Sequence, residues 1–416
     1  MSLFRKLEID LRLIGMLTAL IVIWSGFHIL SNGAFLTPRN LWNLSVQTSA
    51  IAIMATGMVL VIVTRNIDLS VGSLLGFVGM VVGVVQARWL PELLGLEHPL
   101  TWVISLLVAM SLGGLIGLFH GVLIAYLAIP SFIVTLGGLL VWRGSAWWVT
   151  TGQTVAPMDG RFRSLGGGIE GAIGASASWI VASIAVIAVL VSQFLARRRK
   201  LAFGFAVRPI WAETLVAGLI VLAIVGATVI VNAYPLPAGI ARRIIEASGG
   251  VWPSGGVSIP HGYAVPVLVA VGVGIVMTFI TKRLRFGRYV FSIGGNPEAA
   301  QLSGINTKQV LMFVFGLMGV LTGIAACITT ARLNAATNSA GTLDELYVIA
   351  AAVIGGTSLA GGVGTIVGAM LGALIMQSLQ SGMVLLGVDT PLQNIVVGIV
   401  LVAAICLDGI YRRRIR

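Results

Sequence analysis

The chain has 416 residues, of which 57% are hydrophobic and only 10% are charged, and its mean hydropathy is +1.02. A soluble domain carries roughly a quarter of its residues as charged side chains, so this composition excludes a water-soluble globule and predicts a polytopic membrane protein. The net charge of +12 does not indicate a nucleic-acid partner, because the basic residues lie in short segments beside apolar runs.

Apolar runs that approach or exceed the length needed to cross a bilayer occur along the whole chain. They predict an all-α fold, in which residues 1–416 form a single transmembrane domain of about 10–12 membrane helices. Some connections are too polar or too rich in glycine for a plain helix, so broken or re-entrant segments are also expected. The runs lie at residues 11–30, 43–63, 69–87, 101–128, 131–149, 178–196, 209–231, 263–281, 309–331, 345–359, 363–386 and 393–410.

Lysine and arginine are unevenly distributed between the predicted loops. Short loops rich in these residues stay in the cytoplasm, and an even number of spans puts both termini on one side. With cytoplasmic N- and C-termini, a basic loop at 197–208 and a longer polar segment at 282–308 are also cytoplasmic. The basic residues assigned to this side are Arg5, Lys6, Arg12, Arg197, Arg198, Arg199, Lys200, Arg208, Lys282, Arg283, Arg285, Arg288, Lys308, Arg412, Arg413, Arg414 and Arg416.

The first break in the apolar pattern lies between the second and third runs, where Asn66, Asp68 and Ser70 occur near membrane depth. Polar groups are costly there unless protein or an aqueous cavity surrounds them. Asp68 and Ser70 are suited to cap the start of the third helix, where the helix dipole favours the carboxylate. The alternative is that all three residues line a translocation pathway.

The fifth apolar run contains a charged residue, Arg143, close to Trp142, Trp147 and Trp148. The tryptophans are typical anchors at a membrane–water interface. Arg143 is expected to face a partner group or an aqueous cavity, which makes it a candidate for the wall of the pathway. Snorkelling of its long side chain to the membrane surface is the alternative.

Two segments predicted on the outer side, 150–177 and 232–262, are longer than typical connections. Neither is long enough to form a separate domain. They are expected either to form a rim that a soluble partner contacts or to serve only as connecting chain.

The segment 282–308 is a polar, basic island between two long apolar runs. Asn296 is suited to be an N-cap, Pro297 fits the first helical position, and Glu298 lies in the first turn. Gly304 can adopt the left-handed conformation that ends the helix. A helix of about two turns is too short to be stable alone, so we expect it to dock on a partner. An ordinary solvated basic loop is the alternative.

A second break contains Thr357 and Ser358 between two pairs of glycines, at 355–364. So many glycines predict a broken or re-entrant helix, or backbones in close contact. The sequence at 363–368 also echoes 71–76, and both follow a break, as in transporters built from internal repeats.

Motifs for catalysis and cofactor binding are missing. There is no GxxxxGK[ST] phosphate loop, no HExxH motif and no metal-ligand spacing among the four histidines. The GxGxxG pattern at 166–171 has no strand before it, so we reject it as a dinucleotide site. Cys327 and Cys406 lie in apolar runs far apart in the sequence, so neither a disulfide nor a metal site is expected from them. The sequence therefore predicts no enzyme, no catalytic residue, no metal and no cofactor bound by this chain.

Four motifs, at 67–72, 130–136, 294–305 and 355–364, resemble those of ABC-type sugar importer permeases, the family that transports ribose, xylose, arabinose and galactose. Asn66 departs from the glycine or glutamate common at this position. Within the family the chain is most similar to permeases for D-xylose, because it has the basic loop at 197–208 and an added span at 209–231. The resemblance implies a type II ABC importer-like fold and extends from the first span to Asp408.

The resemblance also implies partners and site residues. It implies a permease subunit of an ATP-driven importer in the cell inner membrane, with D-xylose as the expected sugar. Its partners would be a cytoplasmic ABC ATPase that uses ATP and Mg, a periplasmic sugar-binding protein, a second permease copy and the lipid bilayer. The pathway candidates are Asn66, Asp68, Ser70, Arg143, Thr357 and Ser358. The implied ATPase-coupling residues are Gly294, Gly295, Asn296, Pro297, Glu298, Ala299, Ala300, Leu302, Ser303 and Gly304.

The competing hypothesis is an autonomous secondary transporter or channel for a small polar solute, with Asp68 or Glu345 as the ion-coupling group. Such proteins usually carry chains of intramembrane acidic residues, which are absent here. The sequence does not fix the sugar, because a binding protein can set the selectivity of an importer.

Overall fold

The computed structural model describes residues 11–413, except 248 and 254. Arg5, Lys6, Arg414 and Arg416, used above to orient the chain, lie outside the described residues. Within those residues the protein is helical, and the only β-structure is three isolated bridges, which confirms the all-α prediction. The helices are α2 (Leu11–Leu30), α3 (Pro38–Val63), α4 (Val71–Val84), α5 (Leu90–Leu94), α6 (Thr101–Ala125), α7 (Ser131–Trp148), α8 (Gly160–Arg163), α9 (Gly174–Ala202), α10 (Ile210–Asn232), α11 (Ala238–Ala247), α12 (Val265–Arg283), α13 (Arg285–Gly295), α14 (Pro297–Leu302), α15 (Thr307–Leu333), α16 (Asp344–Ile354), α17 (Ile366–Leu385) and α18 (Thr390–Arg413).

Each predicted apolar run falls on a helix of the structure. In the described part of the chain, nine helices are long and apolar enough to cross a membrane. The prediction of a full span at 345–359 is wrong, because α16 has only 11 residues. At 1.5 Å per residue it reaches about 16 Å, roughly half of a hydrocarbon core about 30 Å thick. It is a half-helix that stops inside the protein.

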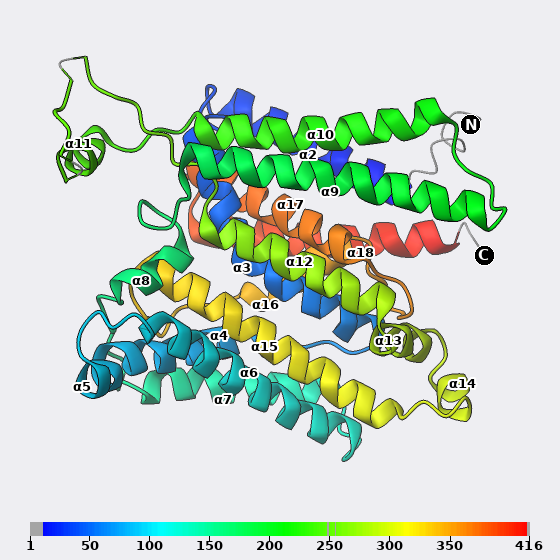
Figure 1. The fold of residues 1–416 in the computed structure, drawn as a ribbon. Helices are drawn as coiled ribbons and strands as arrows, with labels where there is room; N and C mark the ends of the chain where they lie inside the picture. Colours follow the sequence, from blue (N-terminus) through cyan, green and yellow to red (C-terminus); the bar gives the residue numbers. More distant parts are fainter. Residues whose placement is uncertain (1–10, 248, 254, 414–416) are drawn as a thin grey trace.

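The helices form a bundle whose axes run roughly in one direction, with α3 near its centre (Figure 1). Almost all of α3 is buried, and it packs against α12, α15, α16 and α17. On one side of α3 lie α4, α6, α7 and α15, and on the other lie α2, α9 and α10. The core of the molecule is therefore built around a helix with apolar residues on all sides, as expected for a buried membrane helix.

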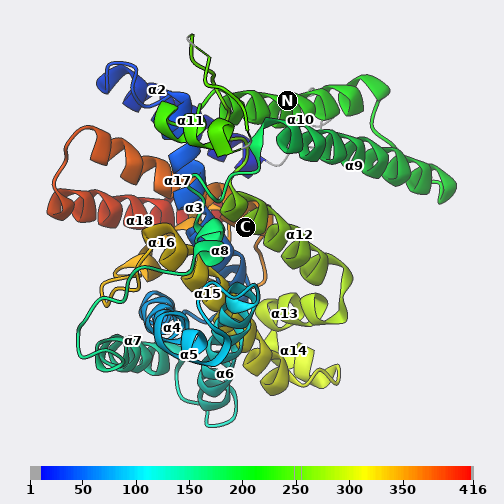
Figure 2. The same cartoon turned by 60° about the vertical axis from the view of Figure 1, so that its left-hand side comes forward.

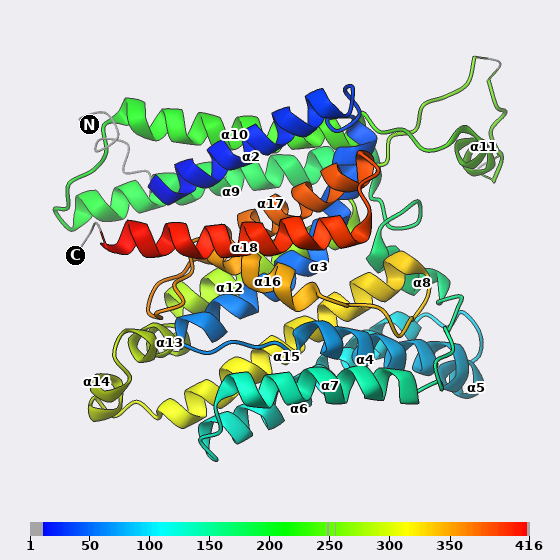
Figure 3. The same cartoon turned by 180° about the vertical axis from the view of Figure 1, so that it is seen from behind.

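The basic segments gather at one end of the bundle. The connection between α9 and α10, helices α13 and α14, the start of α2 and the end of α18 all lie there (Figure 1 and, from behind, Figure 3). Helices α5, α8 and α11 lie at the opposite end. The structure thus brings together the described segments that the positive-inside rule assigns to one side of a membrane.

The two predicted breaks are real. After α3 the chain is non-helical until α4, and after α16 it is non-helical until α17. The predicted repeat is shifted in register, because Val71 is the first residue of α4, whereas Val363 precedes the start of α17 by three residues. Thr365 caps α17 by accepting from the Gly368 amide at 3.1 Å. No residue of the matching segment 71–76 has this role in α4.

Two predicted loops contain more helix than expected. The basic loop at 197–208 begins as the last turns of α9, which continues to Ala202. Lysine and arginine are good helix formers and are favoured at the negative end of the helix dipole. Within 282–308 the chain forms α13 as well as the short helix that was predicted.

Candidate functional site

The short helix α14 has the local structure that its sequence predicts. The side chain of Asn296 accepts a hydrogen bond from the Ala299 amide at 3.1 Å, and Pro297 occupies the first turn with Glu298. The Ser303 hydroxyl donates to the carbonyl oxygen of Ala299 at 2.8 Å. Gly304 has φ +82°, the left-handed conformation that ends the helix.

Helix α14 projects from the end of the bundle (Figure 1). Ala300 is buried and anchors one face of α14, whereas Leu302 is 89% exposed. Asn296, Pro297, Glu298, Ala299 and Ser303 are also exposed. The helix is too short to be stable alone, and it exposes a leucine. Both features are typical of a surface that binds a protein partner.

Helix α13, which the sequence analysis missed, connects α14 to the bundle. Its buried residues are Gly287, Val290, Ile293 and Gly294, a spacing of three and four residues that indicates an amphipathic helix. This apolar spacing is present in the sequence, but the arginines of the same segment make it resemble a polar loop. Gly294 and Gly295, assigned to the coupling loop, form the last turn of α13.

The end of α13 meets both broken segments of the bundle. Arg65, directly after α3, donates from Nε to the carbonyl oxygen of Gly294 at 3.0 Å and from Nη2 to that of Gly295 at 2.8 Å. The Gly362 amide, in the second break, donates to the carbonyl oxygen of Val63 at 3.0 Å. A Cβ added at Gly294 would collide with that same Val63 oxygen and with the Gly362 amide. We call this set, Val63, Arg65, Gly294, Gly295 and Gly362, the junction.

The junction contains residues that sequence reasoning did not single out, namely Arg65 and Gly362. Their roles depend on contacts between segments about 230 and 300 residues apart in sequence, which no local pattern reveals. The last carbonyls of a helix attract cations, so the guanidinium of Arg65 fits the end of α13. Helix α14 is therefore connected through α13 and the junction to both breaks.

The first break is held by a buried polar cluster. Asp68 Oδ1 accepts from the amide of Ser70 at 2.9 Å and from its hydroxyl at 2.6 Å. The prediction that Ser70 caps α4 by its side chain is wrong, because this hydroxyl is used by Asp68. The Ser70 hydroxyl also lies 3.5 Å from Nδ1 of His120, and Trp142 Nε1 donates to Nε2 of His120 at 3.1 Å. Trp142 is thus part of this cluster rather than a simple interface anchor.

Two further pathway candidates have protein partners close to the same break. Arg143 donates from Nη1 to the carbonyl oxygens of Asn338 at 2.9 Å and Ala340 at 2.8 Å, on the segment that leads into α16. It therefore faces a partner, as one of the two sequence alternatives predicts, and does not snorkel. Asn66 makes a local contact, from Nδ2 to the carbonyl oxygen of Thr64 at 2.8 Å.

Thr357 and Ser358 belong to the second break and are fully buried. The Ser358 hydroxyl accepts from the Ala360 amide at 3.1 Å, and the Thr357 hydroxyl has no hydrogen-bond partner among the described residues. The structure joins Asp68 to Ser70 directly. In the part of the chain that it describes, no hydrogen bond links Thr357 or Ser358 to the other four pathway candidates.

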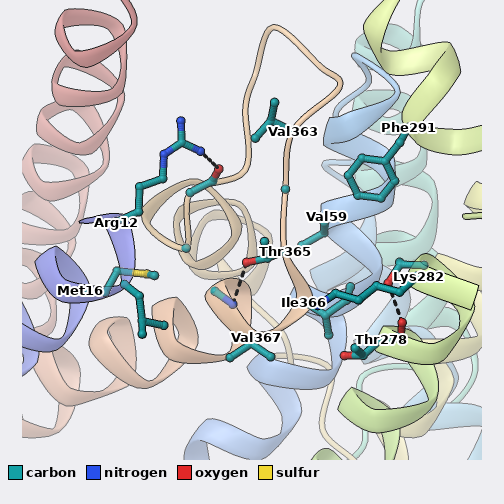
Figure 4. A pocket seen from close by; sticks show the side chains of 16 residues that line it. Arg12, Met16, Val59, Thr278, Lys282, Phe291, Val363, Thr365, Ile366 and Val367 are labelled. Carbon is teal, nitrogen blue, oxygen red and sulfur yellow. Dashed lines mark hydrogen bonds between the residues drawn. The ribbon is translucent and has the colours of Figure 1, made fainter. Parts of the chain in front are cut away.

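A cavity of about 320 Å³ lies beside the second break, between that segment and helices α2, α3, α12 and α13. Figure 4 shows Arg12 and Lys282 on opposite sides of the cavity, with Thr365 between them. Arg12 donates from Nη1 to the carbonyl oxygen of Gly356 at 3.2 Å, and Phe291 of α13 forms part of the wall. The second break therefore has open space beside it.

The described residues contain no group of three or more His, Cys, Asp or Glu side chains that could hold a metal ion. The cluster of Asp68, Ser70, His120 and Trp142 is joined mainly by contacts between side chains, whereas Arg143 is held by backbone carbonyls.

Comparison with known proteins identifies the chain's relatives. The family model described as branched-chain amino acid transport system / permease component matches residues 40–217 and 205–405. The chain is 36% identical over 405 residues to the xylose transport system permease protein XylH of Haemophilus influenzae, covering 97% of this chain and 98% of the relative. XylH of Escherichia coli K12 is 37% identical over 98% of this chain and 94% of the relative.

A second group of relatives is more distant. The ribose import permease protein RbsC of Escherichia coli K12 is 32% identical over 375 residues, covering 90% of this chain and 87% of the relative. No solved structure matches the chain. The family match, the full-length relatives and the bundle of apolar helices agree, and this chain belongs to the family of membrane permeases described as branched-chain amino acid transport system / permease component.

Proposed function

We propose that the chain is the membrane-spanning permease subunit of an ATP-driven, binding-protein-dependent importer of a monosaccharide, with D-xylose as the expected sugar. The substrate follows from the relatives named xylose transport system permease proteins, at 36% and 37% identity over nearly the whole chain. The observation that carries the mechanism is the junction, where the end of α13 is hydrogen-bonded to Arg65 and packed on Gly362.

In this proposal, a cytoplasmic ABC ATPase binds α14 and uses ATP and Mg, while the permease binds neither. Closure of the ATPase pushes α14, and α13 carries the displacement to the two breaks because helices transmit force as rigid elements. The exposed Leu302 is the apolar contact for the ATPase. Asn296, Pro297 and Gly304 fix the shape of the helix that makes this contact.

Two copies of the permease are proposed to form the pathway between them, with a periplasmic sugar-binding protein at the end of the bundle that carries α5, α8 and α11. The gathering of basic segments at the other end supports a cytoplasmic location for α14 and both termini. Asn66, Asp68, Ser70, Arg143, Thr357 and Ser358 stay candidates for the pathway. In a single chain Asp68, Ser70, Thr357 and Ser358 are buried.

The direct test is the double variant Glu298→Lys, Gly304→Pro. Proline cannot adopt the φ of +82° at Gly304, and lysine at position 298 faces the positive end of the α14 dipole. We expect the variant to insert into the membrane but to lose xylose uptake that depends on ATP. The measurement is uptake and ATP hydrolysis in proteoliposomes that contain the permease, the ATPase and the binding protein.

A matched control is Glu97→Lys, Gly95→Pro, which makes the same changes in a loop at the opposite end, where Gly95 has φ +88°. This control leaves α14 unchanged and is therefore expected to keep the ATPase bound to the permease during co-purification. Wild-type transport by the Glu298→Lys, Gly304→Pro variant would contradict the role of α14. Uptake by the permease alone, driven by an ion gradient, would support an autonomous secondary transporter with Asp68 or Glu345 as the coupling group.

The sugar is tested separately, by competition of unlabelled pentoses and hexoses against labelled xylose in the same proteoliposomes. Preference for D-xylose is the expected result. A preference for ribose would keep the importer mechanism and replace the substrate.

A further inference from the structure

The connection between α9 and α10 forms a basic, aromatic tip that the proposed transport mechanism does not use. We define the tip as residues 197–211, which contain Arg197, Arg198, Arg199, Lys200 and Arg208. The first four lie in the last turns of α9, and the chain turns back before α10 begins at Ile210. Figures 1 and 2 show α9 and α10 side by side, with the tip standing away from the rest of the bundle.

The α9–α10 hairpin is attached to the bundle mainly at its other end. There the Ser178 hydroxyl accepts from the Tyr263 amide at 2.9 Å, and the hydroxyls of Thr228 and Tyr263 are 2.9 Å apart. In the described residues α9 packs chiefly against α10, and α10 also packs against α3. Both helices expose apolar side chains over most of their length, which lipid must cover.

The tip lies where the apolar surface of the hairpin ends. Leu190, Val191 and Phe194 are exposed on α9, and the basic residues follow within one turn. Beyond them, Phe203 is 77% exposed and Phe205 is 66% exposed. Aromatic residues beside arginine and lysine are typical of the headgroup region of a bilayer, so the tip is placed at the level of the lipid phosphates.

The tip also contains a cavity of about 140 Å³ between α9 and α10, lined on its polar side by Gln193, Arg197, Lys200, Arg208 and Glu213. Arg197 is held in place, because its Nη1 donates to Glu213 Oε2 at 2.6 Å and to the carbonyl oxygen of Arg208 at 3.1 Å. Glu213 thereby balances Arg197, and the other basic residues leave the tip strongly positive. The guanidinium of Arg198 stacks over the ring of Phe194 at 5.1 Å.

We propose that this tip binds the headgroup of an anionic phospholipid. Basic pockets between membrane helices are suited to such headgroups, because ammonium and guanidinium groups pair with phosphate and the helices pack against the acyl chains. The phosphate occupies the cavity beside Lys200 and Arg208, and Phe203 and Phe205 insert between neighbouring lipids. The bound lipid fixes an end of the hairpin that has few contacts with the bundle. This binding does not depend on which solute the permease carries.

The test uses the purified full-length permease in a neutral detergent, with cardiolipin, phosphatidylcholine or inorganic phosphate added. Cardiolipin is expected to raise the midpoint of thermal unfolding and to stay bound in native mass spectrometry, whereas phosphatidylcholine and inorganic phosphate do neither. The variant Arg198→Gln, Arg199→Gln, Lys200→Gln is expected to lose most of the cardiolipin shift. It leaves Arg197 and its contact with Glu213 intact.

The control is Arg88→Gln, Arg242→Gln, Arg243→Gln, which removes the same charge from exposed positions at the opposite end and is expected to keep the shift. The charge-conserving variant Arg198→Lys, Arg199→Lys, Lys200→Arg is also expected to keep it, which separates lipid binding from a folding defect. An unchanged shift in the glutamine variant overturns the proposal. An equal response to inorganic phosphate also overturns it, because the ligand would then be a free anion. If the glutamine variant loses co-purification of the ATPase but keeps the cardiolipin shift, the tip binds a protein partner instead, and the proposal is again overturned.

Discussion

Arg65 has φ +64°, in the left-handed region that residues other than glycine seldom adopt. Such strain costs on the order of 1–3 kcal/mol and persists only where the surrounding structure requires it. Here the conformation turns the chain out of α3 and aims the guanidinium at the last two carbonyls of α13. The strained residue is thus the contact between the first break and the segment proposed to receive the push of the ATPase.

Replacement of Arg65 by alanine is expected to leave the protein inserted but to lower sugar uptake per ATP hydrolysed. Hydrogen bonds from a charged group contribute about 1.5–3 kcal/mol, and about 1.4 kcal/mol corresponds to a tenfold change in an equilibrium. A loss of about tenfold is therefore expected in proteoliposomes. Arg65→Lys keeps the charge but not the two directed bonds and should fall between. Full coupling in Arg65→Ala would remove Arg65 from the mechanism.

At the scale of elements, the junction is the place where three segments cross with their backbones in contact. Gly294 of α13 lies against the carbonyl oxygen of Val63 at the end of α3 and against the amide of Gly362 in the second break. Only a residue without a side chain allows this approach. The adjacent Gly295 has open space around the position of a Cβ, so the two glycines differ in packing while lying in the same turn.

Gly294→Ala is expected to lower the free energy of unfolding by about 1–3 kcal/mol, the usual cost of overpacking. The measurement is thermal or denaturant unfolding of the purified protein. Gly295→Ala, which adds the same methyl group one residue later, is expected to leave stability unchanged or slightly raised, since alanine favours helix over glycine. Equal effects of the two substitutions would show that the crossing is looser than described.

At the scale of the whole molecule, a second cluster closes the end of the bundle opposite α14. The rings of Tyr234 and His261 stack with centroids 4.2 Å apart, and Trp42 lies 5.1 Å from His261. His261 Nδ1 lies 3.2 Å from the carbonyl oxygen of Tyr234, and Trp42 Nε1 donates to that of Gly262 at 2.9 Å. This cluster ties α3, the end of α10 and the segment before α12 together.

Burial lowers the pKa of His261 below its ordinary value, although bonding to the backbone of Tyr234 and Pro235 acts in the opposite direction. The folded protein therefore prefers neutral His261. The unfolded chain binds this proton at a pKa of about 6.5, so the contribution to stability is complete above that pH. It is lost as the pH falls from about 6.5 through the lower folded pKa.

Hydrogen exchange of residues 233–262 is therefore expected to accelerate below about pH 6.5, beyond the intrinsic pH dependence of exchange. His261→Phe, which keeps an aromatic ring but cannot be protonated, should remove this additional acceleration. A variant with the same pH dependence as the wild type would assign the effect to another group.

The sequence by itself determined the features that depend on neighbouring residues. Apolar runs placed each of the nine helices that are long and apolar enough to cross a membrane in the described residues, because hydrocarbon demands an apolar surface and an internally bonded backbone along each crossing. Asn296, Pro297 and Gly304 defined α14, because caps and turns are formed within a few residues. The glycines around Thr357 and Ser358 marked the second break for the same reason.

The tertiary structure alone decided what those elements contact. Nothing local to Arg65 points to Gly294. The local sequence of Ser70 predicts a cap, but its hydroxyl is bonded to Asp68 near His120. The half-helix α16 also follows from packing rather than from composition. Contacts between residues hundreds of positions apart are selected by the fit of whole surfaces, and this information is distributed over the bundle rather than written in any one segment.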